Sequence, residues 1–531
     1  SIIDSNGEAR AFSSAGSRNS WNFKNLLNYR NTFGKHRLDV LAGVEASKNT
    51  IKVNNIRGTG FSNSTLKTPQ DAAVVESYYN ESAKTFLSIL GRVNYDFDGK
   101  YLLSVTARRD GSSVFGRNKR WGLFPAVSLG YNISEEPFFD GIKETVNYLK
   151  LRASYGVSGN AEIGNYAWVS TYAQANYNGA SGITLANIGD DELGWESALQ
   201  TNIGLSMQMF DGKFRLDVDV YEKLTQDLLL PYPVTVLSGL TQVTTNLGEI
   251  KNEGIEAMVG VTLVDKDDFT WDAELTYAWN TNEVIDIGDN AEGIDIPGFG
   301  TTSIYIGKPI GIQTIPIWVG VEPATGQDIY QALDGRHLTV AEAASEFGSL
   351  NNFLNANRVP FGNPYPDFTG GFSSRLTYKN WSVSTLWNFS VGQTYIASGE
   401  QIQGKFAYGS MNITPLRSQL GRWRNPGDIV RVAQVTTDPT IWGRTSEYVA
   451  EIDYLRMRDL TIAYRFNIQD SSLVKSVDLF AKFTNFLTFT NAPGSMYDPE
   501  NYVRGGNLNL MDKWKQVPQA KSVNLGINIK L

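Results

Sequence analysis

Apolar and polar residues alternate over much of this chain. Between residues 201 and 221, apolar residues occupy every second position on both sides of an Asp211-Gly212 pair. Strict alternation is typical of a strand with one apolar and one polar face, and Asp-Gly between two such runs indicates a hairpin. Each run has about the 9–11 residues that a tilted strand needs to cross a bilayer. The pattern fits a soluble sandwich or a barrel whose apolar face meets lipid.

Fifteen segments show this alternation, and they extend along the whole chain. No long segment has a period of 3.6, although residues 338–347 are expected to form one short helix in a loop. The sequence therefore predicts an all-β protein. The fifteen predicted strands are residues 21–32, 37–48, 85–96, 101–109, 121–133, 148–156, 198–209, 214–224, 254–264, 269–284, 368–378, 381–391, 454–466, 476–487 and 522–531.

Short and long connections between these segments alternate along the chain. The long ones are residues 49–84, 110–120, 157–197, 225–253, 285–367, 392–453 and 488–521. Outer-membrane barrels have tight periplasmic turns and longer extracellular loops, whereas long loops without structure are uncommon in compact soluble domains. Aromatic residues near many strand ends fit an interfacial girdle. This alternation of short and long connections favours a transmembrane antiparallel β-barrel in the outer membrane.

The number of strands indicates that this barrel is incomplete. Single-chain bacterial barrels have an even number of strands and both termini in the periplasm. With fifteen strands and a periplasmic C-terminus, the first strand also descends, so the chain begins outside the cell. We expect residues 1–20 to be an extracellular loop segment and residues 21–531 to be the C-terminal part of the barrel.

Composition narrows the chemistry. The 531 residues have a formal net charge of −8, no cysteine and two histidines. The chain has no run of 18 apolar residues, so the sequence predicts no transmembrane helix. No Lys/Arg cluster suggests a nucleic-acid partner. With only His36 and His337 available, a zinc site or a histidine-based triad has little support. We expect no enzyme activity, no catalytic residues, no metal and no cofactor.

Several motifs resemble a known family. They are RRDGSSVFGRNKRWGLFPAVSLGYNISEEPFF (108–139), LKLRASYGVSGN (149–160), LGW (193–195) with QTNIG (200–204), NEGIE (252–256), GNPYPDFTGG (362–371) and DYLRMRDL (453–460). Together they resemble the barrel half of SusC/RagA-type TonB-dependent outer-membrane transporters of Bacteroidetes. The resemblance implies about 22 strands around a plug, a segment engaged by TonB, and a SusD-like surface lipoprotein that covers the barrel and helps to capture glycans or peptides.

The chain departs from that family in its N-terminal part. No TonB box or plug precedes Trp21. In a barrel of about 22 strands, the fifteen segments would be the eighth to the last, and the eighth strand descends, as the parity argument requires. We therefore expect the plug and the first strands to come from a separate or unseen segment, through which TonB would act.

Two sets of residues are candidates for function. The first set is charged, lies on the polar face of predicted strands, and is expected to face the lumen and contact the plug: Arg152, Arg215, Asp217, Asp219, Asp272 and Glu274. The second set is aromatic, is expected in loops, and could bind a ligand or pack loops together: Tyr78, Tyr79, Trp168, Tyr172, Tyr177, Trp423 and Trp442. The basic run Arg117, Lys119 and Arg120 could contact lipopolysaccharide phosphates.

These features lead to three hypotheses about function. The first is active, TonB-dependent import of a large polar nutrient, a glycan, oligosaccharide or peptide, with this chain forming the barrel wall, the external loops and the surface on which the lipoprotein docks. The second is a passive porin or specific channel without a plug. The third is a soluble β-rich binding or adhesion protein, which the alternation of short and long connections disfavours.

Overall fold

The computed structural model describes residues 2–3, 9–62, 68–178, 180–288, 294–295, 303–396, 417–435, 445–468, 474–492, 498–500 and 518–530. The chain divides into two compact units. Unit 1 comprises residues 1–131, 153–201 and 225–247, and unit 2 comprises residues 132–152, 202–224 and 248–531. Four strands contribute residues to both units: β6 (Trp121–Asn132), of which only Asn132 belongs to unit 2, β7 (Val146–Asn160), β10 (Glu196–Met209) and β11 (Phe214–Gln226).

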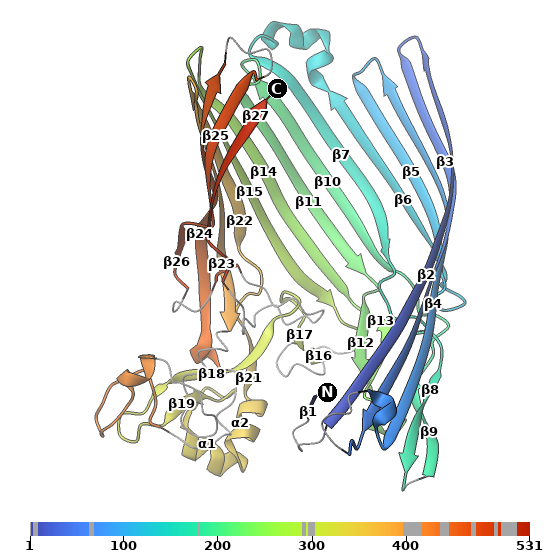
Figure 1. Cartoon of the computed structure of the whole chain (residues 1–531), viewed down its shortest axis with the longest axis vertical. Coiled ribbons are helices and arrows are strands. Elements are labelled where there is room, and N and C mark those ends of the chain that lie inside the picture. The colour runs from blue at the N-terminus through green and yellow to red at the C-terminus, as the bar shows by residue number, and fades with distance from the viewer. Residues whose placement is uncertain are drawn as a thin grey trace. The chain divides into compact units, whose positions relative to one another are not determined.

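Unit 1 is built from long antiparallel strands that follow one another along the chain (Figure 1). Each of them pairs with the next: β2 (Ala9–Phe33), β3 (His36–Thr59), β4 (Val74–Phe97), β5 (Tyr101–Ser112) and β6 (Trp121–Asn132). Among its smaller elements, β1 (Ile2–Ile3) pairs with the start of β2. Two hairpins are formed by β8 (Thr171–Tyr177) with β9 (Ala180–Asn187) and by β12 (Leu229–Pro233) with β13 (Gln242–Asn246). Short 3-10 turns lie at Pro69–Asp71 and Val236–Ser238.

Unit 2 contains the remaining long strands, again antiparallel and paired in order, except that β27 pairs with β25. They are β14 (Glu249–Lys266), β15 (Phe269–Asp286), β22 (Phe368–Tyr378), β23 (Trp381–Ile396), β24 (Val449–Asn467), β25 (Ser476–Thr484) and β27 (Ser522–Lys530). Shorter pieces are β16 (Ile294–Asp295), β17 (Ser303–Ile304), β26 (Thr488–Thr490), and 3-10 turns at Ile133–Glu135, Pro137–Ile142, Arg417–Gly421 and Ser446–Tyr448.

The predicted strands are confirmed, because each of the fifteen segments overlaps one of these long strands. The Asp-Gly hairpin is confirmed as well. Phe210, Asp211 and Gly212 all have positive φ angles, of 53°, 57° and 80°, and Lys213 N–H donates to the Phe210 carbonyl at 3.2 Å. Gly212 adopts the left-handed conformation without steric cost, and aspartate tolerates it better than most residues.

The strands are longer than the alternation predicted. Residues 9–20, which the sequence analysis placed in a loop, continue β2, and residues 10–20 pair with residues 49–59 of β3. Residues 49–59 and 74–84, also assigned to a loop, are strand in the structure. Polar residues occupy both faces here, so period-2 alternation of hydrophobicity gave no signal. Backbone pairing extends the strands where no apolar face has to be buried.

One face of the strands in each unit is apolar and uncovered. Leu27 in unit 1 is 73% exposed, and Ile203 and Leu525 in unit 2 are 60% and 80% exposed. These residues belong to the regular apolar series of their strands. An apolar face of this size left uncovered indicates an apolar environment outside the protein.

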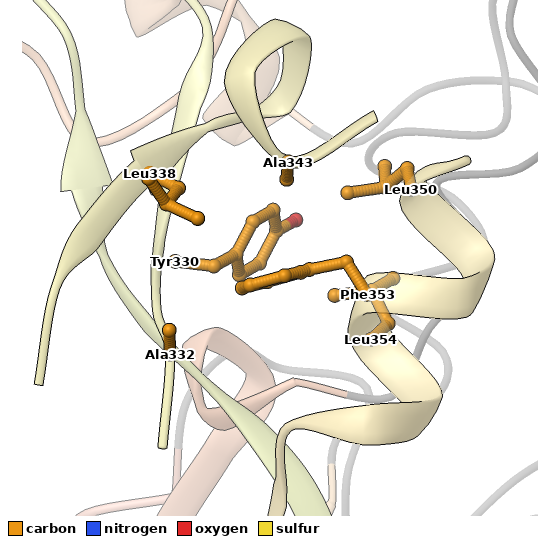
Figure 2. Packing of buried hydrophobic residues seen from close by; sticks show 7 residues of the cluster. All are labelled: Tyr330, Ala332, Leu338, Ala343, Leu350, Phe353 and Leu354. Carbon is orange, nitrogen blue, oxygen red and sulfur yellow. The ribbon is translucent and has the colours of Figure 1, made fainter. Parts of the chain in front are cut away.

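A connection of unit 2 contains a hydrophobic core of its own. We call residues 313–361 the loop module: β18 (Gln313–Val321), β19 (Asp328–Gln331), β20 (His337–Thr339), α1 (Val340–Phe347), α2 (Leu350–Ala356) and β21 (Arg358–Phe361). Tyr330, Ala343, Leu350 and Phe353 are buried against one another at its centre (Figure 2).

The sequence predicted α1 but missed α2. Thr339 caps α1 in a capping box with Glu342, and Gly348 ends the helix with a φ of 77°. The second helix has only seven residues, too few for a helical period to stand out. No helix in the described part of the chain is long and apolar enough to span a membrane.

Candidate functional sites on the polar face

The polar face of unit 1 carries cross-strand rows of side chains. Strand register places Lys24 opposite Glu45, Glu45 opposite Ser88, and Ser88 opposite Asp110. Lys24 Nζ lies 2.6 Å from the Glu45 carboxylate. Arg108 links three members of this row, since it donates to Asp110 at 2.7 Å, to Ser88 at 2.8 Å and to Glu45 at 3.1 Å. The row is therefore a fixed network across four strands.

A pocket of about 380 Å³ opens beside this network, wholly within unit 1. Asn22, Ser47 and Phe86 form the next row across β2, β3 and β4, and Trp195 and Glu162 also line the pocket. The volume falls in the range of about 300–1,000 Å³ that small-ligand sites occupy. Donors and acceptors beside two aromatic rings can hold an uncharged polar group or a short polar chain.

Unit 2 brings the six predicted lumen-facing charges to one polar face, where most of them pair with each other. Arg152 lies 2.8 Å from Asp219 and 3.5 Å from Asp217. Arg215 lies 3.9 Å from Glu274, and Asp272 accepts a hydrogen bond from Thr262 at 2.7 Å.

Both arginines lie above a glycine that leaves room for them. A Cβ on Gly204 would come within 2.3 Å of the Asp219 carboxylate and 2.8 Å of the Arg152 guanidinium. A Cβ on Gly260 would lie 2.9 Å from Arg215. These close approaches explain why glycine serves at both positions.

A second pocket, of about 580 Å³, lies on the same face of unit 2. Asp217, Asp219, Glu256 and Glu274 line it together with Tyr454 and small residues of β22. The contacts above account for the charged residues as a hydrated, internally paired wall. The contact of these residues with a plug stays a prediction.

A buried ionic cluster was missed by the sequence analysis. Arg456 of β24 is 4% exposed, and its guanidinium contacts Asp498 at 2.7 Å and Glu500. Arg458, on the same strand, lies 2.5 Å from Glu500 and donates to Gln519 at 2.8 Å. The sequence signal was the DYLRMRDL motif, which indicated the family but not the acidic partners some forty residues later.

The electrostatics of this cluster favour the ionised carboxylate. Burial raises the pKa of Asp498, but hydrogen bonds from Arg456 and from the backbone N–H groups of Gln519 and Glu500 outweigh burial, so the pKa is lowered overall. Buried charges that are paired and hydrogen-bonded in this way fix a loop to a strand.

The predicted loop aromatics have different surroundings from one another. Tyr78 and Tyr79 lie in β4, not in a loop, and donate to Glu76 and Glu81; Tyr172 lies in β8 and is exposed. Trp168 and Trp423 fasten loops together. Trp168 donates to the Ser113 carbonyl at 3.1 Å, and Trp423 donates to the Pro323 carbonyl at 2.8 Å.

Two of the seven aromatics give no structural result. Trp442 lies outside the described residues, and only the backbone of Tyr177 is described.

Two residues of the basic run, Arg117 and Arg120, contact Trp168. Their guanidinium groups lie 5.7 Å and 5.4 Å from its ring. Within the described ranges, no three His, Cys, Asp or Glu side chains are arranged to hold a metal ion.

Long antiparallel strands with a networked polar face and an uncovered apolar face define the class of membrane β-barrel walls. A family model described as TonB dependent receptor-like, beta-barrel matches residues 3–486. The chain belongs to this family. The barrel fold is thereby confirmed, and a relative named SusC confirms the resemblance to SusC-type receptors.

Individual relatives agree with this assignment. TonB-dependent receptor P39 of Formosa agariphila is 29% identical, over 96% of this chain and 52% of its own length. TonB-dependent receptor SusC of Bacteroides thetaiotaomicron is 27% identical, over 67% of this chain and 36% of its own. The structure of the RagAB peptide importer in the open-open state has a TM-score of 0.84 at 23% identity, over 100% of this chain and 56% of that chain. The chain spans about half the length of the curated relatives it matches.

Proposed function

We propose that this chain forms the wall and external loops of a TonB-dependent outer-membrane importer of a large polar nutrient. The observation that carries the proposal is that each unit has an uncovered apolar face and a polar face with a pocket, of about 380 Å³ in unit 1 and about 580 Å³ in unit 2. An apolar outside suits lipid, and a hydrated, charged inside suits a polar cargo and a plug that must shift.

The partners follow from the same role. A plug and the first strands of the barrel would come from sequence outside this chain, and TonB would act through them. Arg152, Arg215, Asp217, Asp219, Asp272 and Glu274 would then contact the plug. The pairs that Arg152 and Arg215 already form could be exchanged for plug contacts at low cost, because all members are partly exposed to water.

The external loops would dock a SusD-like lipoprotein and hold cargo. Tyr78, Tyr79 and Tyr172 are the predicted aromatics whose rings are exposed, so they are the better candidates for cargo contact than Trp168 and Trp423, which hold loops together. Cargo could be an oligosaccharide or a peptide, because the pocket in unit 1 offers aromatic rings, carboxylates and amide groups. Arg108 pairs with two of the three carboxylates that line the pocket, Glu45 and Asp110, which favours an uncharged segment of either polymer.

Uptake measurements test the proposal. Cells that express the full-length protein should accumulate a fluorescent oligosaccharide or peptide from a panel, and accumulation should stop when TonB is deleted or the proton-motive force is collapsed. Accumulation that persists without TonB would make the passive channel the correct model. A protein that fractionates as soluble, away from the outer membrane, would exclude both models.

A further inference from the structure

A groove of about 920 Å³ lies on the apolar face of β23, β24, β25 and β27, within unit 2. The groove results from the register of these strands. Ala481 is paired with Ile462 on one side and Leu525 on the other, so a methyl group lies between two larger side chains. Trp381 and Tyr464 are paired beside this position and form the aromatic end of the groove.

The groove occupies one half of the apolar band. It begins at Phe466, the last residue but one of β24, and reaches Ile462. Four residues of strand span about 13 Å, which is about half of the 25 Å apolar band of an outer-membrane barrel. The groove therefore lies in a single leaflet, on the side where the turns are short.

Two lysines lie at the aromatic end of the groove. Lys379 precedes Trp381 in the turn, and Lys475 precedes β25. Lys475 is exposed. Lys379 Nζ lies 3.9 Å from Asp268, and both side chains are more than half exposed, so that contact is weak. Lysines at this level attract anionic headgroups.

We propose that this groove is a binding site for one acyl chain of an anionic glycerophospholipid, whose phosphate group lies near these lysines. The inference rests on the membrane placement in the proposed function. The acyl chain packs over Ala481, between Ile462 and Leu525, and the Trp381 and Tyr464 rings lie at the boundary with the headgroup, where aromatic side chains are favoured.

A lipid suits the groove better than a further strand. Ala481 lies on β25, one strand away from β27, and Trp381 lies three strands away. A strand added beside β27 would lie about 4.8 Å beyond it in the plane of the sheet, and so would lengthen the groove wall without covering its floor.

Native mass spectrometry of the full-length protein in detergent tests the site, with dioleoylphosphatidylglycerol and dioleoylphosphatidylethanolamine as probes. The native protein should retain phosphatidylglycerol at collision energies that remove phosphatidylethanolamine. Ala481→Phe, which fills the groove, should lower phosphatidylglycerol occupancy at least tenfold. Lys379→Gln with Lys475→Gln should reduce the preference for phosphatidylglycerol while leaving overall lipid retention intact.

Ala273→Phe is the matched control, because Ala273 belongs to the apolar series of β15 and does not line the groove. It should retain lipid like the native protein. Equal loss in both phenylalanine variants, or no loss in Ala481→Phe, would show non-specific lipid contact and overturn the site. That result would leave TonB-dependent uptake untouched, whereas a protein that is soluble without detergent would overturn the membrane placement itself.

Discussion

Single charged residues in this chain differ widely in what their contacts contribute. The Arg456 side chain is 4% exposed and is held between two carboxylates that are equally buried. Arg465, nine residues later on β24, forms a two-pronged pair with Asp478 at 2.7 and 3.0 Å but is 60% exposed. Removing one partner of a buried pair leaves an uncompensated charge, whereas water replaces an exposed partner.

Arg456→Ala should therefore lower the free energy of unfolding by about 3–5 kcal/mol, whereas Arg465→Ala should leave it nearly unchanged. Urea unfolding of the detergent-solubilised protein, followed by tryptophan fluorescence, measures both. Equal effects of the two substitutions would contradict the account of the buried cluster.

Acid should weaken the same cluster. Because the pKa of Asp498 is lowered in the folded protein, its carboxylate stabilises the fold above the unfolded pKa of about 3.9, and that stability is lost as the pH falls through the folded pKa. Melting temperatures measured from pH 7 to pH 3 should fall less steeply in Asp498→Asn than in the native protein. Parallel profiles would show that Asp498 is not the titrating group.

Gly204→Ala should separate Arg152 from Asp219 without unfolding the protein. The added Cβ would meet only the ends of these two flexible side chains, so they can move aside. We expect a change of about 1 kcal/mol or less in the free energy of unfolding. A crystal or cryo-EM structure of the variant should show an Arg152–Asp219 distance above 4 Å, and an unchanged pair would contradict this reading.

For single residues, the sequence predicted the strand face on which a side chain lies better than it predicted which residues that side chain contacts. Alternation placed Arg152, Asp217 and Asp219 on the polar face, because side-chain direction follows from strand period alone. It could not predict that Asp498 folds back onto Arg456, since that contact joins residues 42 apart through a connection without a repeating pattern.

Among the elements, the loop module has its own hydrophobic core. Tyr330, Leu338 and Phe353 are buried within residues 313–361 (Figure 2). The module is also fastened to other loop segments, since Trp318 N–H donates to Ser446 at 2.9 Å.

Phe353→Ala should remove about 3–5 kcal/mol from the module, because the ring is fully buried. Limited proteolysis should then cleave within residues 313–361 faster than in the native protein, while the strands stay intact. Leu333→Ala, at a side chain that is 64% exposed, should not change the cleavage rate. Loss of the strands together with the module would show that the two fold as one unit.

The accuracy of the predicted strand boundaries depends on how regularly apolar residues alternate along each strand. The strands β22 (Phe368–Tyr378) and β6 (Trp121–Asn132) were predicted to within one residue, since their apolar series runs from end to end. The hairpins β8–β9 and β12–β13 were assigned to loops. Their strands have only five to eight residues, too few for alternation to stand out.

For the whole molecule, the uncovered apolar face should respond to charge as a lipid-facing surface does. Ile203→Arg should cost about 2–4 kcal/mol in a bilayer, although Ile203 is 60% exposed. Asn202→Arg, its neighbour on the polar face, should cost little. Outer-membrane assembly of the two variants, followed by heat-modifiable migration on gels, compares them, and equal assembly would contradict the membrane placement.

The strand length in unit 1 has a consequence for the cell surface. β2 has 25 residues and β3 has 24, but crossing the hydrocarbon layer takes about 9–11. At about 3.3 Å per residue, a dozen residues of each strand, including residues 9–20, measure some 40 Å along the strand, and a strand tilt of about 40° would bring their end about 30 Å clear of the hydrocarbon. An antibody against this stretch would then label intact cells, and a protease outside the cell would reach it before any part of the membrane-embedded wall.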